Sequence, residues 1–137
     1  MGTKIFVNLP VKDLDKSKAF FSALGYTFNA QFTDATAACM VISDDIYSML
    51  LTEAKFNEFM PKAKTIADAR KTTEVMVALS ADSKAAVDGL CDKAMKAGAG
   101  EVRLPQDYGF MYGRSFADLD GHIWEVIWMD PNFIQKS

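Results

Sequence analysis

The chain has 137 residues, 50% of them hydrophobic, and it carries a net charge of −3 with a pI near 5.1. A chain of this length can bury a sizeable core, either as one domain or as two small modules that share a core. Its acidic balance and its lack of any basic cluster argue against nucleic acid as the main partner. Because no apolar run approaches the roughly 18 residues of a membrane span, we expect no membrane insertion.

The two cysteines, Cys39 and Cys91, lack the spacing of a metal site. In a chain without a secretory signal they predict reduced thiols in a cytoplasmic protein. Cys39 is a conceivable nucleophile, but no basic residue is placed beside it by sequence, and a buried structural cysteine is the favoured interpretation. The eight methionines and ten phenylalanines indicate either an adaptable core or an apolar ligand cavity.

The first half of the chain shows the pattern of a strand, a helix and three further strands. The segment 13–15 supplies an N-cap, and Gly25 ends the helix that follows. The acidic pair 44–45 predicts a tight turn, and the charged, alanine-rich stretch 54–73 predicts a connector with a helical part. The regular elements expected here are a strand at 5–11, a helix at 16–24, and strands at 26–32, 37–43 and 46–52.

The second half repeats this pattern. Residues 82–83 cap a helix that Gly98 ends, and the Asp-Gly pair at 120–121 predicts a hairpin turn, since glycine accepts a positive φ without steric cost. The elements expected here are a strand at 74–80, a helix that extends to 96, a short strand at 101–104, and a closing hairpin of strands at 112–118 and 122–128.

The chain is therefore an internal repeat of strand, helix and three strands. A repeat unit of this length exposes an apolar sheet face when alone and must pair with its copy. The predicted fold class is α+β, with two βαβββ repeats whose half-barrel sheets pair around a cavity while the helices lie outside. We expect a first module at 1–60, a connector at 61–71 and a second module at 72–137, which together make one structural domain.

One carboxylate, Glu125, lies in the middle of the almost wholly apolar run 122–129. A lone carboxylate in a buried strand must be paired, neutralised or bound to a ligand, because burying a bare charge costs several kcal/mol or more. Arg114, at the start of the neighbouring strand, is its expected partner in a cross-strand salt bridge, and the alternative is that Arg114 anchors an anionic ligand. His122, the only histidine, is interpreted as a turn residue rather than as a ligand.

Two stretches resemble the vicinal oxygen chelate superfamily, which includes glyoxalase I, the bleomycin- and fosfomycin-resistance proteins and the extradiol dioxygenases. Residues 7–21, VNLPVKDLDKSKAFF, together with Gly25 are similar to its opening. Residues 118–125, DLDGHIWE, are similar to its closing D-P-D-G-x-x-x-E motif, with Leu119 in place of the usual proline. The resemblance covers nearly the whole chain, which is most similar to a bacterial branch usually labelled predicted lactoylglutathione lyase.

The resemblance implies a paired βαβββ fold, a homodimer and, in the metalloenzymes, a divalent metal held by His and Glu from the first and last strands of each repeat. The matching positions here are Phe6, Met49, Glu74 (or Val75 by spacing) and Glu125. Phe6 offers no donor and Met49 is a soft ligand, whereas an open divalent site needs about three protein donors. We therefore expect no tightly bound metal and no other cofactor, with Glu74 and Glu125 as the candidate ligands if a metal does bind.

Three functions are consistent with these features. The first is a binding protein that holds a small, largely apolar molecule in the cavity, as the bleomycin-resistance proteins of this fold do. The second is a lyase or isomerase, similar to lactoylglutathione lyase, in which Glu125 and Glu74 act as acid and base or as weak metal ligands. The third is a dimer whose cavity its own side chains fill. The expected ligand-binding residues are Phe6, Asn8, Met49, Met76, Phe110, Tyr112, Arg114 and Glu125.

Overall fold

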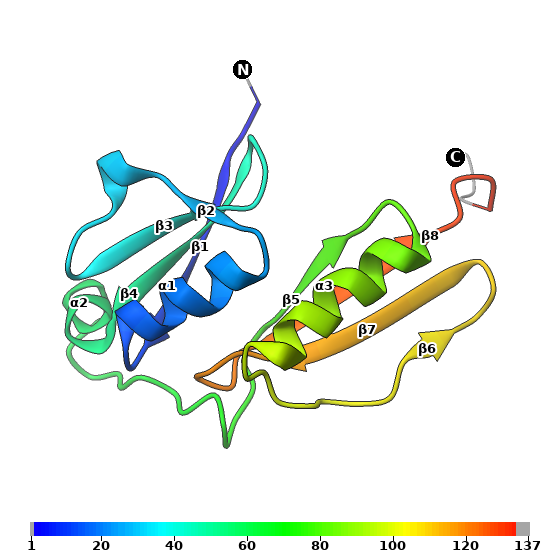
Figure 1. The fold of residues 1–137 in the computed structure, drawn as a ribbon. Coiled ribbons are helices and arrows are strands. Elements are labelled where there is room, and N and C mark those ends of the chain that lie inside the picture. Colours follow the sequence, from blue (N-terminus) through cyan, green and yellow to red (C-terminus); the bar gives the residue numbers. More distant parts are fainter. Residues whose placement is uncertain (1, 134–137) are drawn as a thin grey trace. The chain divides into compact units, whose positions relative to one another are not determined.

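The computed structural model describes residues 2–133, so the outer ends of the two predicted modules, residue 1 and residues 134–137, lie outside the described part. The chain forms two compact units, residues 1–67 and 68–137. Each unit contains one four-stranded mixed sheet and the element order βαβββ, as Figure 1 shows. The predicted α+β class is confirmed.

In the first unit, the sheet order β1-β4-β3-β2 places the first and last strands of the repeat side by side and parallel. The Asp13 carboxylate caps α1 by accepting a hydrogen bond from the Lys16 backbone N–H at 3.1 Å. Gly25 follows the helix with a φ of 106°. The elements are β1 (Ile5–Val11), α1 (Leu14–Ala23), β2 (Thr27–Phe28), the 3-10 turn η1 (Ala30–Phe32), β3 (Ala37–Val41), β4 (Ile46–Thr52) and α2 (Glu53–Phe59).

The core of the first unit lies between its sheet and α1. Leu9 and Val11 of β1, Leu50 of β4, and Phe20 and Phe21 of α1 are all buried. Because strand residues alternate between faces, the neighbouring positions on β1 and β4 point to the other side of this sheet.

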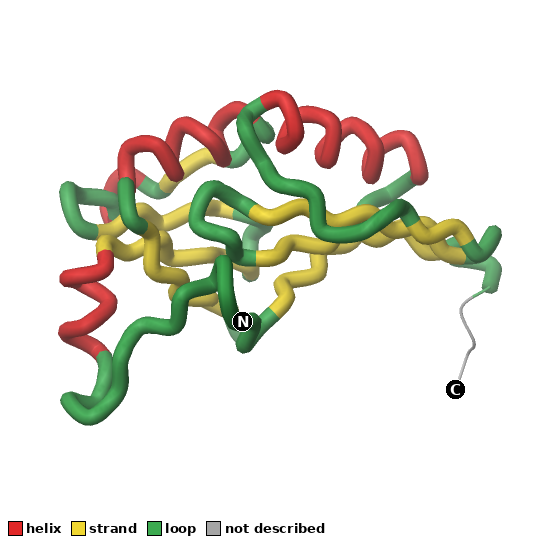
Figure 2. Tube along the Cα trace, turned by 90° about the horizontal axis from the view of Figure 1, so that it is seen from below, coloured by secondary structure: helices red, strands yellow, loops and turns green. Residues whose placement is uncertain are grey.

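The second unit repeats this arrangement with the sheet order β5-β8-β7-β6, in which β5 and β8 are parallel and β8 and β7 form a hairpin. Figure 2 shows that α3 lies along one face of this sheet. On that face Phe116, Trp124 and Val126 are buried, together with Val87 and Cys91 of the helix. The elements are β5 (Met76–Ser80), α3 (Lys84–Lys96), β6 (Gln106–Asp107), β7 (Met111–Ala117) and β8 (Ile123–Met129).

The strand predicted at 101–104 is wrong. The structure has a two-residue strand at Gln106–Asp107 instead, and upstream of it only Gly100 bridges to Ala117. Leu104 is 84% exposed, so it has no sheet face to bury, and Pro105 has no N–H to donate to a ladder. The segment 101–105 is therefore an irregular loop that connects Gly100, opposite Ala117, to Gln106, opposite Gly113 of β7.

The strand predicted at 26–32 is mostly wrong, because only Thr27–Phe28 pairs with β3. The Asn29 side chain accepts a hydrogen bond from the Gln31 backbone N–H at 3.0 Å and starts the 3-10 turn η1. Asparagine side chains compete with strand ladders in this way. Within residues 2–133, no helix combines the length and the apolar character that a membrane span needs.

Candidate functional site

Glu125 lies at the centre of β8, on the side of the second sheet opposite to α3. In the ladder it faces Ser115 of β7 and Ala78 of β5. We call this surface the Glu125 face; since paired residues share a face, it contains Met76, Ala78, Ser80, Gly113, Ser115, Ala117, Ile123, Glu125, Ile127 and Met129. The surface is therefore mainly apolar, with the carboxylate at its centre.

The partner of Glu125 is Arg103, not Arg114. The Arg103 guanidinium donates from Nη2 to Glu125 Oε2 and forms an ion pair with it. The side chain of Glu125 is 15% exposed and that of Arg103 is 38% exposed, so this pair lies at the edge of solvent. Arg103 comes from the irregular 101–105 loop, where no periodic sequence pattern marks it, and the sequence analysis missed it.

Arg114 and Tyr112 lie on the opposite face of the sheet, against α3, because their register partners are Val126 and Trp128. Arg114 donates to Asp88 and to Asp92 at 2.9 Å each, and the Tyr112 hydroxyl donates to Asp88 at 2.7 Å. The cross-strand salt bridge predicted between Arg114 and Glu125 is thus wrong. Successive strand residues point to opposite faces, and the acidic surface of α3 attracts Arg114.

These contacts shift three pKa values. The hydrogen bond from Tyr112 and then the guanidinium of Arg114 hold the pKa of Asp88 below its usual value. The same hydrogen bond raises the pKa of Tyr112. Burial lowers the pKa of Arg114, but its hydrogen bonds to Asp88 and Asp92 outweigh that effect and leave it raised. Arg114 is therefore a permanent cation, and its ion pairs with Asp88 and Asp92 link β7 to α3.

Ser115 is the polar residue directly opposite Glu125 on the Glu125 face. It is 9% exposed, and its hydroxyl oxygen is buried without a hydrogen-bond partner among the described residues. A buried hydroxyl without a partner costs about 1–3 kcal/mol relative to a bonded one. Because Ser115 is directly opposite Glu125, the two side chains form a small polar site within a mainly apolar surface.

The structure does not bring Glu74 to Glu125. Glu74 is exposed and precedes β5, whereas the residue that faces Glu125 across the ladder is Ala78, four positions later and about 13 Å along an extended chain. Met76, by contrast, shares the Glu125 face through its register with Ile123, and it is 54% exposed. The two residues that face Glu125 across the ladder, Ala78 and Ser115, therefore offer no second carboxylate for an acid–base pair.

The predicted residues of the first unit share one face of their own sheet. Phe6 pairs with Tyr47 and stacks on its ring at 4.8 Å, and Asn8 pairs with Met49. Met49 also pairs with Cys39, which is buried. Burial raises the pKa of the Cys39 thiol, which weakens it as a nucleophile and agrees with a structural role.

Phe110 lies just before β7, where it belongs to a small aromatic cluster. Its ring stacks on that of Phe133 at 4.1 Å and approaches that of Tyr108 at 6.3 Å. Tyr108 and Phe133 are more than half exposed. This cluster lies at the end of the β7–β8 hairpin farthest from the 118–121 turn, so Phe110 is several residues away from Glu125 along the ladder.

The 118–121 turn closes the hairpin and is rigidly held. Asp118 accepts hydrogen bonds from the backbone N–H groups of Asp120 and His122 and from the Trp124 indole, all at 3.0 Å. Burial raises the pKa of Asp118, although His122 and these hydrogen bonds oppose the rise. The backbone of His122 is thus part of the turn, as the sequence analysis expected.

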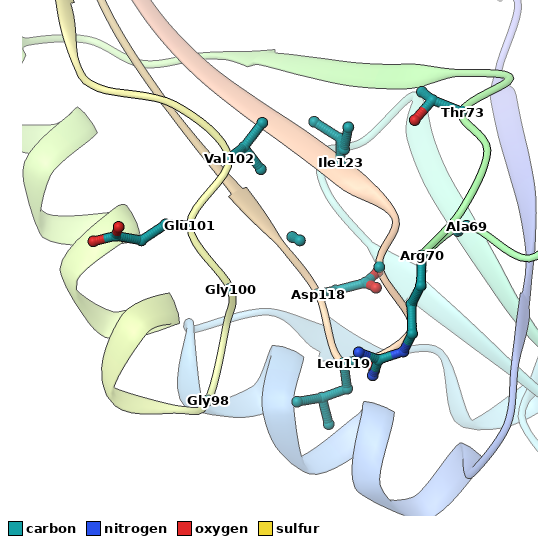
Figure 3. A pocket seen from close by; sticks show the side chains of 12 residues that line it. Ala69, Arg70, Thr73, Gly98, Gly100, Glu101, Val102, Asp118, Leu119 and Ile123 are labelled. Atoms are coloured by element: carbon teal, nitrogen blue, oxygen red, sulfur yellow. The ribbon is translucent and has the colours of Figure 1, made fainter.

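A pocket of about 460 Å³ lies between this turn, the 98–102 segment and the 69–73 segment, all within the second unit. Figure 3 shows Arg70 reaching toward Leu119, whose carbonyl oxygen accepts a hydrogen bond from its guanidinium. Ala117 and Ile123 contribute the Glu125 face to the lining. The pocket is therefore close to Glu125, since its lining residue Ile123 lies two positions before Glu125 in β8. Its lining residues are Ala69, Arg70, Thr73, Gly98, Gly100, Glu101, Val102, Ala117, Asp118, Leu119, Gly121 and Ile123.

The donors present do not fit the divalent metal that the fold family implies. Phe6 has no donor atom, Met49 offers only a thioether, and the carboxylate of Glu125 is engaged by a guanidinium. No group of three or more His, Cys, Asp or Glu side chains with a metal-binding arrangement occurs within the described residues.

Comparisons with known proteins agree with this fold. Residues 3–43 match the family described as bleomycin resistance protein-like N-terminal. The hypothetical protein SA1046 from S. aureus is 28% identical, with a TM-score of 0.77 over 93% of this chain and 94% of that one. No curated protein gives a significant sequence match.

Two further solved structures share the fold at lower identity. A glyoxalase/bleomycin resistance protein/dioxygenase family enzyme from Burkholderia phytofirmans PsJN is 16% identical, with a TM-score of 0.77 over 93% of this chain and 99% of that one. A lactoylglutathione lyase from Agrobacterium tumefaciens is 17% identical, with a TM-score of 0.66 over 93% and 94%.

The chain thus has the vicinal oxygen chelate fold, and the resemblance inferred from its two motifs is confirmed. Within that class, its N-terminal segment is similar to the bleomycin resistance protein-like N-terminal family.

Proposed function

We propose that this protein binds a small, largely apolar molecule on the Glu125 face, without a tightly bound divalent metal. The pocket beside Glu125 carries the proposal, because its volume of about 460 Å³ is that of a small-molecule site. Apolar walls supplied by Val102, Leu119 and Ile123 suit the body of such a ligand. The Glu125 carboxylate and the Ser115 hydroxyl supply the few polar groups that fix the ligand's orientation.

The residues of the first unit, Phe6, Asn8 and Met49, remain proposed ligand contacts on their own sheet. Tyr112 and Arg114 have less support, because both are engaged by acidic groups of α3. Phe110 also has less support, because it packs within its own aromatic cluster.

The alternative function is a lyase or isomerase that uses Glu125 and Glu74 as acid and base. It has less support, since the ladder register separates the two carboxylates by about four strand residues. General acid–base chemistry needs both groups within hydrogen-bond reach of one substrate.

A fragment screen followed by NMR with labelled Ile and Met methyl groups tests the binding proposal. We expect hits to shift the methyl signals of Ile123, Ile127 and Met76 and to raise the melting temperature, because a ligand that binds only the folded state stabilises it. Glu125→Gln should weaken these hits, whereas Lys93→Gln, on the exposed side of α3, should not. Shifts confined to residues on the α3 side of the sheet would contradict the proposal.

A further inference from the structure

The Arg103–Glu125 pair joins an irregular loop to a strand. Glu125 is fixed in the middle of a seven-residue strand that pairs on both sides. Arg103 lies in the 101–105 segment, which belongs to no helix or strand and is anchored at Gly100 and at Gln106. A cation on an irregular segment therefore contacts an anion in a regular sheet.

We propose that Arg103 is an intramolecular competitor for the ligand, and that the ligand displacing it carries a compact organic cation, a primary ammonium group. This inference rests on the proposed binding function and names the polar end of the ligand. The ammonium takes the place of the guanidinium at the Glu125 carboxylate, and Arg103 moves into solvent.

The free-energy cost of releasing Arg103 from Glu125 is small. Its side chain is already 38% exposed, and the adjacent Leu104 is 84% exposed, so neither residue contributes to the core. An ion pair between partly exposed groups contributes little net stability. The carboxylate is not left bare, because one cation replaces another.

Ser115 explains why an ammonium group is favoured over the guanidinium. Its buried hydroxyl stays without a partner while Arg103 is bound to Glu125. A primary ammonium has three N–H donors on a single atom, so it can donate to Glu125 and to the Ser115 oxygen that faces it across the ladder. The ligand thereby supplies a hydrogen-bond partner that Ser115 does not find among the described residues.

The charges on this face disfavour an anionic ligand. Any anion bound to Arg103 would lie beside the Glu125 carboxylate, and like charges at contact distance repel. The net charge of −3 also attracts cations over the whole molecule.

Three matched probes test the inference: hexylammonium, hexanol and hexanoate, which share a chain and differ in the head group. Their affinities are measured by NMR titration of the Ile123 and Ile127 methyl signals. Of the three probes, we expect hexylammonium to bind the unmodified protein most tightly. Arg103→Gln should raise the affinity for hexylammonium about three- to tenfold, because the competing ion pair is gone. The affinity for hexanol should change little in Arg103→Gln.

Ser115→Ala and Glu125→Gln provide the opposite test. We expect Ser115→Ala to weaken hexylammonium about three- to tenfold and Glu125→Gln to weaken it more, because each removes one acceptor for the ammonium. Arg103→Lys, which keeps a competing cation, should behave as the unmodified protein does. Lys93→Gln removes the same charge from the far side of α3 and should leave all three affinities unchanged.

The outcomes separate this inference from the proposed function. If hexanoate binds best, or if Arg103→Gln weakens hexylammonium, then Arg103 is a ligand anchor and the inference is wrong while the binding function stands. Binding of all three probes with equal affinity would also overturn it. Failure of every probe to shift any signal of the Glu125 face, in both the unmodified protein and Arg103→Gln, would overturn the inference and the binding function together.

Discussion

At the scale of single residues, the main finding is that Glu125 has a partner that comes from a loop. Arg103 and Glu125 are 22 positions apart, and the intervening chain includes β6 and all of β7. An almost wholly apolar run identified the strand of Glu125, and the cost of burying a charge indicated that it needs a partner. No rule of spacing selects Arg103 over Arg114, because a loop residue has no register.

A double-mutant cycle measures this pair. We expect Glu125→Gln and Arg103→Gln each to lower the free energy of unfolding, with a coupling of about 1 kcal/mol, the low end for a charged hydrogen bond because both groups are partly exposed. Urea denaturation of the two single variants and the double variant gives the coupling. A coupling near zero would show that the pair contributes nothing to the stability of the folded chain.

At the scale of elements, most helices and strands follow from periodicity and capping. The strands Ile5–Val11 and Ile46–Thr52 have the predicted bounds, and Gly25 and Gly98 follow their helices with φ values of 106° and 107°. The errors occur where a side chain competes with the backbone, as at Asn29, or where no face is available to bury, as at Leu104. Such local effects have no signature in hydrophobic periodicity.

The 118–121 turn requires glycine for two reasons. Gly121 has a φ of 93°, and an added Cβ would lie 2.9 Å from the Arg70 Cγ and 3.0 Å from the Arg70 backbone nitrogen. We expect Gly121→Ala to destabilise the fold by about 2–4 kcal/mol, because backbone strain and a steric clash add.

Gly98→Ala is the matched control for this turn. Its φ is 107°, but an added Cβ would meet only the Leu119 side chain at an ordinary 3.5 Å. We expect a loss of about 1–2 kcal/mol from backbone strain alone. Equal losses for the two variants in urea denaturation would show that segment 69–70 does not press on the turn.

The ion pairs that link β7 to α3 predict that the stability of the fold depends on pH. The pKa of Asp88 is lowered below its usual 3.8 in the folded state. A carboxyl group with a lowered folded pKa stabilises the fold above its unfolded pKa, and this stabilisation is lost as the pH falls through the folded pKa. The relevant window therefore lies below pH 3.8.

We expect Asp88→Asn to lower the urea midpoint at neutral pH and to match the unmodified protein in strong acid. The effect should be modest, because the Asp88 side chain is 46% exposed. Asp92→Asn, at a position that is 64% exposed, should have a smaller effect at neutral pH. A difference between Asp88→Asn and the unmodified protein that persists unchanged into strong acid would contradict this assignment.

At the scale of the whole molecule, apolar surface on both sheets favours association. Phe6 in the first unit is 48% exposed, and Met76 and Met129, which share the Glu125 face of the second unit, are 54% and 44% exposed. Exposed apolar patches of this kind mark interaction surfaces. We expect a homodimer, and light scattering coupled to size exclusion should give twice the 15.1 kDa chain mass. A mass of 15.1 kDa at micromolar concentration would contradict it.

Metal content is the whole-molecule property on which the proposed function depends most. Glu125 is held by Arg103, Glu74 lies apart from it, and the matching positions of the first unit offer only Phe6 and the thioether of Met49. We expect purified protein to hold well under one Zn, Ni, Mn or Fe ion per chain by elemental analysis. Chelator should leave the melting temperature unchanged, because only a metal bound to the folded state would raise it. One tightly held divalent ion per chain, with a melting temperature that falls on chelation, would show that the donors assemble in a way that neither unit reveals by itself.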